Sequence, residues 1–108
     1  MSRPLLARAD TSKEFARQRR EAIGRDGHLC HFERWVKSDR RWKACLSRAT
    51  DTAHVYPRRE CGSAAAHVDV VLRACRKCHN AFDGHPDDDR IVRVPPDREA
   101  KAFKLISA

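Results

Sequence analysis

Five cysteines constrain this chain of 108 residues more than any other feature. Two residues separate Cys75 from Cys78, a spacing that lets two thiolates bind one tetrahedral metal ion from a tight turn. The odd number of cysteines argues against a closed set of disulfides. Aromatic residues make up only 6% of the chain, so the core is thin and would gain from a bound metal. The sequence therefore predicts a structural zinc ion.

Cys30 and Cys45 form the natural second pair of zinc ligands. With Cys75 and Cys78 they would make a closed site of four thiolates, which stabilises a fold but leaves no open position for catalysis. The sequence leaves two alternatives open. Cys61 could replace Cys45, and His79, which directly follows Cys78, could also take its place.

The run Cys75-Arg-Lys-Cys-His79 also fits the attachment motif of c-type haem. That reading requires an oxidising compartment, and Met1–Asp10 has no apolar leader. A thioredoxin-like pair would need a strand-helix-strand setting, which the pattern does not indicate. We therefore expect a reducing, cytoplasmic location, and no membrane association, because no stretch approaches the length of a membrane span.

The net charge of +8 predicts a polyanionic partner. Residues 1–60 hold 15 Lys and Arg against 8 Asp and Glu, whereas residues 61–108 hold 8 against 7. A basic half-chain favours nucleic acid, with DNA first. The plain alternative is a basic surface that only keeps the protein solvated.

Hydrophobic periodicity and turn residues predict a small α+β domain over residues 12–90, preceded by a flexible arm at 1–11 and followed by an extension at 91–108. The expected elements are a helix at 13–23 capped by Thr11 or Ser12, a loop or irregular hairpin within 28–50 and a short strand at 52–57. Residues 68–72 are expected to form a short strand or a run leading into the metal knuckle, and helices are expected from His79 and at 97–106. The last helix should pack through Ala100, Phe103, Leu105 and Ile106. Trp35 and Trp42 are expected to pack, and Asp87–Asp89 to form an exposed acidic patch.

Five segments carry a family resemblance: Arg25–Cys30, Cys45, Ala53–Arg58, Cys61-Gly62 and Leu72–His79. In this order and spacing the chain resembles an HNH (His-Me finger) endonuclease of the type with four zinc cysteines, over roughly residues 13–84. The resemblance implies a ββα-metal fold, in which two short strands and a helix surround a catalytic ion, flanked here by N- and C-terminal helices.

The resemblance also implies roles for individual residues. His54 would be the general base, which suits an imidazole that is neutral near pH 7. His79 would be a ligand of a catalytic divalent ion such as Mg²⁺ or Mn²⁺. Asp83 lies one helical turn further on and offers a carboxylate to the same ion. Independently of the resemblance, the positive charge of the first half of the chain predicts that nucleic-acid phosphates are bound by Arg17, Arg20, Arg58 and Arg59.

Two positions depart from the motif of the family. Its middle asparagine would fall at Val70, with Asp69 the nearest polar replacement, and the residue before the base is Ala53, with Asp51 on the same strand face. The expected function is a metal-dependent endonuclease that hydrolyses DNA phosphodiester bonds. The alternatives are a zinc-stapled nucleic-acid-binding module with a degenerate nuclease site, and an interaction protein in which the zinc is only a staple.

Overall fold

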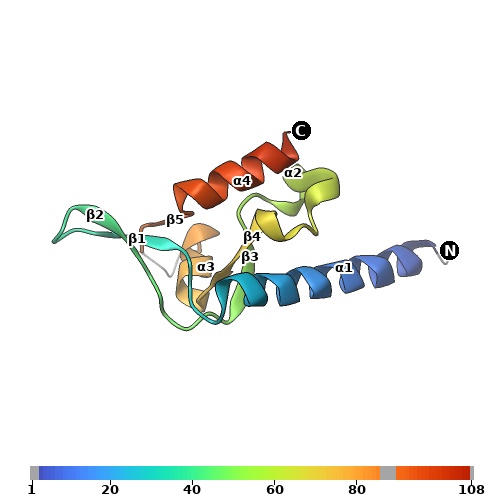
Figure 1. Ribbon diagram of the computed structural model, residues 1–108, viewed down its shortest axis with the longest axis horizontal. Helices are drawn as coiled ribbons and strands as arrows, with labels where there is room; N and C mark the ends of the chain where they lie inside the picture. Colours follow the sequence, from blue (N-terminus) through green and yellow to red (C-terminus); the bar gives the residue numbers. More distant parts are fainter. Residues whose placement is uncertain (1–2, 86–89, 108) are drawn as a thin grey trace.

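The computed structural model describes residues 3–85 and 90–107, with side chains from Lys13 onward (Figure 1). Within these residues the chain is a small α+β protein with four helices and two antiparallel sheets, which confirms the predicted fold class. The acidic patch expected at Asp87–Asp89 lies outside the described residues. In the described part, no helix is both long enough and apolar enough to span a membrane.

Helix α1 spans Arg3–Asp26 and is longer than the predicted helix at 13–23. Residues 5–23 contain neither Pro nor Gly, so nothing in the backbone interrupts the helix. Thr11 and Ser12 therefore lie inside α1 and do not cap it, and the segment expected to be a flexible arm is helical from Arg3. The helix ends at Gly27, whose positive φ of 68° suits glycine.

One face of α1 packs on the body through Gln18, Ala22 and Asp26, which are spaced four residues apart. The buried carboxylate of Asp26 accepts hydrogen bonds from Arg25 and from Arg98 of α4, which spans Pro96–Ile106. Burial acts to raise the pKa of Asp26, but the two guanidinium groups outweigh it and hold that pKa well below its usual range. The carboxylate therefore stays ionised and ties the first helix to the last.

The first sheet is a hairpin with a short third strand. β1 (Glu33–Val36) pairs with β2 (Arg41–Ala44), and β5 (Val92–Arg93) joins the other edge of β1. Figure 1 shows the hairpin projecting at one end of the molecule. The hairpin predicted within residues 28–50 is thus present, and part of the predicted C-terminal extension belongs to the same sheet.

The second sheet and the helix after it frame the candidate site. β3 (Asp51–His54) pairs with β4 (Val71–Ala74), with His54 opposite Val71 and Asp51 opposite Ala74. The connection contains α2 (Arg58–Cys61) and two 3-10 turns, at Gly62–Ala64 and Val68–Val70. Helix α3 (Arg76–Phe82) follows β4 almost at once. The chain thus runs strand, loop, strand, helix around His54.

The core lies between β4, α1 and α4. All four residues of β4 are buried, and the largest fully buried side chains are Phe32, Leu72, Val70, Val71, Cys30 and Cys78. On α4 the buried residue is Ala102, with Leu105 and Ile106 partly buried against the core. The prediction was wrong for Phe103, which is 58% exposed, and for Ala100, which is also exposed. The face of α4 that meets the body carries Ala102, Leu105 and Ile106, and Arg98 on the same helix contacts Asp26.

Candidate metal centre and active site

The sulfur atoms of four cysteines gather at the base of the hairpin. One ligand atom each from Cys30, Cys45, Cys75 and Cys78 lies within 4.8 Å of the others, so the group could hold a metal ion such as zinc. The sulfurs of Cys45 and Cys75 are 3.9 Å apart. Sulfurs around a tetrahedral zinc ion are roughly 3.8 Å apart, given Zn–S bonds of about 2.3 Å. The donor set and its spacing therefore fit zinc.

Three separate elements bring these cysteines together. Cys30 precedes β1 and Cys45 follows β2, and backbone hydrogen bonds from Cys45 to Phe32 and from Leu46 to Cys30 close the base of the hairpin. Cys75 caps α3, and its sulfur accepts a hydrogen bond from the backbone N–H of Cys78. A metal in this group would join the hairpin to α3.

Two alternatives left open by the sequence are resolved by position. Cys61 lies outside the group, and its buried thiol donates to the carbonyl of Tyr56 at 3.6 Å. His79 also lies outside it, since its ring contacts Asp51 and Asp83. Within the described residues the group therefore consists of thiols alone.

Hydrogen bonding within the group shifts the pKa values of Cys30 and Cys78 in opposite directions. The hydrogen bond from Cys78 lowers the pKa of Cys30 to about 5, against the opposing effect of burial. The same hydrogen bond, helped by burial, raises the pKa of Cys78. Thiolate is the form that binds metal, so the arrangement already favours one metal-binding sulfur.

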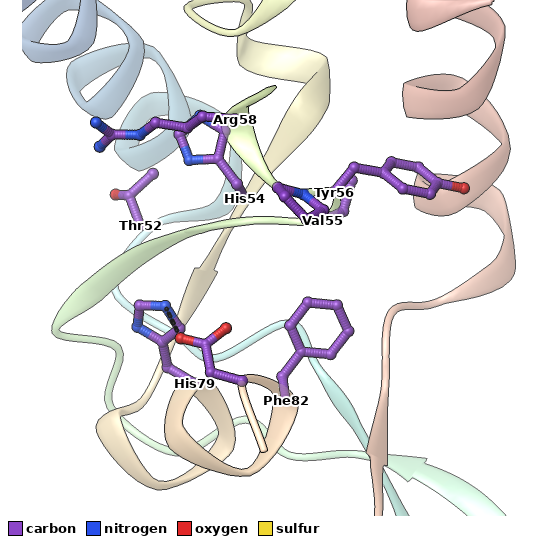
Figure 2. Close-up of a pocket in the computed structure, with 9 residues that line it drawn as sticks. Thr52, His54, Val55, Tyr56, Arg58, His79 and Phe82 are labelled. Carbon is purple, nitrogen blue, oxygen red and sulfur yellow. Dashed lines mark ion pairs between the residues drawn. The ribbon is translucent and has the colours of Figure 1, made fainter. Parts of the chain in front are cut away.

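A pocket of about 550 Å³ lies between the end of β3 and α3. Figure 2 shows His54 and Arg58 on one side of it and His79 and Phe82 on the other. The remaining lining residues are Thr52, Val55, Tyr56, Pro57 and Asp83. Four of the predicted site residues, His54, Arg58, His79 and Asp83, therefore share one pocket.

His54 is held in a defined orientation. Its Nε2 lies 2.8 Å from the backbone carbonyl of Ala65, which also accepts a hydrogen bond from Gln18. A carbonyl can only accept, so Nε2 donates and Nδ1 is the unprotonated nitrogen. Phe15 of α1 contacts the imidazole edge-on, at 5.9 Å between ring centroids.

The environment of His54 favours its neutral form. Burial lowers its pKa below the ordinary value of 6.5, and the positive charges of Arg58 and His79 act in the same direction, whereas the Ala65 hydrogen bond opposes them. A neutral imidazole with one free nitrogen can accept a proton near pH 7.

His79 lies between two carboxylates. Its Nδ1 is 2.8 Å from Asp51 Oδ2, and its Nε2 is 3.3 Å from Asp83 Oδ2. Asp51 also pairs with Arg76, and although burial acts to raise the pKa of Asp51, hydrogen bonds led by that from His79 lower it. Metal-binding histidines commonly give their second nitrogen to such a carboxylate, so this geometry fits a ligand that presents Nε2.

The four predicted phosphate-binding arginines lie in three different places. Arg58 lines the pocket, and its guanidinium lies 4.2 Å from the centroid of Phe15. Arg17 pairs with Glu21 and lines a different hollow, beside Ala64 and His67. Arg20 and Arg59 are exposed and line neither pocket around His54.

Sequence reasoning missed Arg19 as a site residue. It lines a hollow of about 270 Å³ together with Phe15, Asp51, His54 and Arg58. No hydrogen bond or ion pair joins the Arg19 side chain to another described residue. The signal was present, because Arg19 follows Phe15 by four residues and so lies on the helix face that carries Gln18 and Ala22.

The two departures from the family motif correspond to packing positions. Val70 is fully buried, and Ala53 is 1% exposed. Asp69, the nearest polar replacement for the motif asparagine, contacts Arg25 and His67. His54 is instead hydrogen-bonded to the Ala65 carbonyl.

Comparisons with protein-family models, curated proteins and solved structures found no match for this chain.

Proposed function

We propose that this protein is a metal-dependent endonuclease of HNH type that hydrolyses DNA phosphodiester bonds. The observation that carries the proposal is the pocket in which His54 on one side is opposed by His79 and Asp83 on the other. The order of β3, loop, β4 and α3 agrees with the ββα arrangement that the resemblance implies. The basic half-chain supports a polyanionic substrate.

In the proposed reaction, His54 accepts a proton at Nδ1 from a water molecule. The water oxygen forms a bond to phosphorus as the bond from phosphorus to the 3′ oxygen breaks, which leaves a 5′-phosphate. The 3′ oxygen takes a proton from solvent water to become a 3′-hydroxyl, and His54 then releases its proton to solvent. His54 suits this step because its Nε2 hydrogen bond to Ala65 fixes the tautomer and its burial keeps the ring neutral. Arg58 would hold a neighbouring phosphate by charge-assisted hydrogen bonds.

His79 and Asp83 would hold a divalent ion such as Mg²⁺ or Mn²⁺. Their contact at 3.3 Å places an imidazole nitrogen and a carboxylate oxygen together at the pocket, which fits the ligand preferences of such ions. When bound, the ion would polarise the scissile phosphate and neutralise the leaving oxygen. The four thiols at the hairpin base would hold zinc as a structural staple and take no part in the chemistry.

A second candidate is a zinc-stapled DNA-binding module whose nuclease site is degenerate. It is favoured by the buried Val70 at the position of the motif asparagine and by the buried Ala53 before the base. In this case the pocket would still bind phosphate, since Arg58 is retained, but no bond would be cleaved.

A plasmid-nicking assay separates the two candidates. Supercoiled plasmid is incubated with wild type and with His54→Ala in a panel of divalent ions. We expect wild type to nick with Mg²⁺ or Mn²⁺, and the variant to lose about 100-fold or more because a general base contributes on that scale. His28→Ala, which removes an exposed imidazole outside the pocket, is the matched control and should cleave normally. Salt-sensitive binding by wild type without cleavage would support the second candidate.

A further inference from the structure

The hairpin of β1 and β2 stands apart from the core. Figure 1 shows it extending from the body, joined at its base by β5. Trp35 and Trp42 face each other across the strands, 5.5 Å apart at their centroids, and neither belongs to the hydrophobic core of the described residues. They stiffen the hairpin by packing on each other. The two tryptophans therefore pack, as expected, but they pack on each other and not on the core.

The two faces of the hairpin carry different side chains. Alternation along the strands puts Glu33, Trp35, Trp42 and Ala44 on one face and Arg34, Val36, Arg41 and Lys43 on the other. The tryptophan face is closed by Arg93, which stacks on Trp42 and pairs with Glu33. The second face is cationic.

Most of the positive charge on the hairpin has no anionic partner in the described part of the chain. Lys43 pairs with Asp39, and Glu33 pairs with Arg93. No ion pair within the described residues involves the other four cations of the hairpin, which are Arg34, Lys37, Arg40 and Arg41. Like charges gathered on one ribbon repel each other, so this surface gains from an anionic ligand.

The tip of the hairpin holds a cation in an unfavourable backbone conformation. Arg40 has a φ of 51°, in the left-handed region where glycine or asparagine is usual. A glycine would turn the chain here without strain, yet this position carries an exposed arginine. Retained strain of this kind is concentrated at binding and catalytic positions.

We propose that the cationic face and tip of this hairpin bind the phosphates of duplex DNA, at a surface separate from the cleavage pocket. A two-stranded ribbon fits the major groove of B-form DNA, whereas the deep, narrow major groove of duplex RNA excludes it. The inference rests on the proposed function for nucleic acid as the partner. Metal binding by Cys30 and Cys45 would anchor the ribbon at its base.

The test is DNA binding by a double variant, Arg40→Gly with Arg41→Ala, measured by fluorescence anisotropy across a range of salt concentrations. The buffer contains zinc but no Mg²⁺ or Mn²⁺, so cleavage does not contribute. Lys101→Ala with Lys104→Ala is the matched control, because it removes two exposed cations from α4. Melting temperatures are recorded for both, and Arg40→Gly removes strain, so the hairpin variant should melt no lower than wild type.

We expect the hairpin variant to bind duplex DNA more weakly and its salt slope to fall by about 1.8, or about 0.9 for each lost phosphate contact. Equal slopes for the hairpin variant and the α4 control would overturn the inference. An equal loss on duplex RNA of the same sequence would overturn the assignment to the DNA groove. If wild type never cleaves but its binding depends on the hairpin, the proposed function fails and this inference stands.

Discussion

The thiol group and the pocket beside His54 share one short stretch of chain but differ in their access to solvent. Cys75 and Cys78 belong to the first, and His79 to the second. The thiol group is the more closed of the two, since Cys30, Cys75 and Cys78 are buried and Cys45 is partly exposed. The other donor set is open, with side-chain exposures of 29% for His79 and 63% for Asp83.

This difference separates stability from chemistry. A closed set of four thiols satisfies a tetrahedral ion completely and leaves no position for substrate. An imidazole and a carboxylate at the edge of a pocket leave positions for water and phosphate. Because the two sets are adjacent in sequence, the first fixes where α3 begins and so where the second lies.

The largest effect is expected from breaking the closed set. Cys75→Ser should lose the metal and unfold, because structural zinc contributes about 10 kcal/mol or more, comparable to the whole stability of a small domain. Metal analysis and circular dichroism would measure both losses. Cys61→Ser is the matched control: this thiol is buried too but lies outside the group, so the metal should remain. Retention of metal and fold by both variants would contradict the assignment.

Metal binding by His79 and Asp83 should weaken when the carboxylate that contacts the other nitrogen of His79 is removed. Asp51→Asn removes the carboxylate that holds Nδ1, and we expect roughly 10- to 100-fold weaker use of the divalent ion. The readout is the Mn²⁺ concentration that gives half-maximal nicking, which should rise while the zinc content is unchanged. The control variant Asp97→Asn, at an exposed position in the first turn of α4, should leave this Mn²⁺ concentration unchanged. An unaltered Mn²⁺ requirement in Asp51→Asn would contradict the proposal that Asp51 positions His79 for metal binding.

The pH profile of cleavage reports on the pocket beside His54, because the thiol group takes no part in proton transfer. Burial and the charges of Arg58 and His79 lower the pKa of His54, so the base stays unprotonated down to below pH 6.5. The rate should therefore rise with pH, at most tenfold per unit for one group, with its inflection below pH 6.5. Arg58→Gln should move the inflection to higher pH. An inflection above pH 7 in wild type would contradict the assignment.

The smallest effect concerns the arginines of α1. Arg19→Ala should weaken cleavage several-fold, or about 1 kcal/mol, because Arg19 lies beside His54 without a partner among the described residues. Arg17→Ala should matter less, since Arg17 pairs with Glu21 at a different hollow. The two variants are compared by their initial cleavage rates at subsaturating DNA. An equal loss of rate in both would mean that the arginines of α1 act only through their general positive charge.

The cysteine group could be anticipated from sequence because its signal is chemical and largely local. Cys75 and Cys78 bind from one turn, and only three other thiols were available to complete the set. The sharing of one pocket by His54 and His79 was expected from the order of motifs. The α+β class followed from the alternation of short apolar runs with helical periodicity.

Features that depend on register and long-range packing were not anticipated. Asp51 meets His79 because β3 pairs with β4 in a register that sets Asp51 opposite Ala74, just before α3. Arg98 reaches Asp26 from 72 residues away and joins α4 to α1. No local pattern encodes either contact, which explains why Phe103 was wrongly assigned to the core.

The most direct test of the central claim is a Mn²⁺ titration of the zinc-loaded protein, followed by electron paramagnetic resonance. The account predicts that wild type binds Mn²⁺ without releasing zinc. Asp83→Ala should bind Mn²⁺ more weakly and keep its zinc and its melting temperature, because Asp83 is exposed and outside the thiol group. Three results would contradict the claim that the chain has two independent metal sites. These are release of zinc by Mn²⁺, loss of zinc in Asp83→Ala, and unchanged Mn²⁺ binding by that variant.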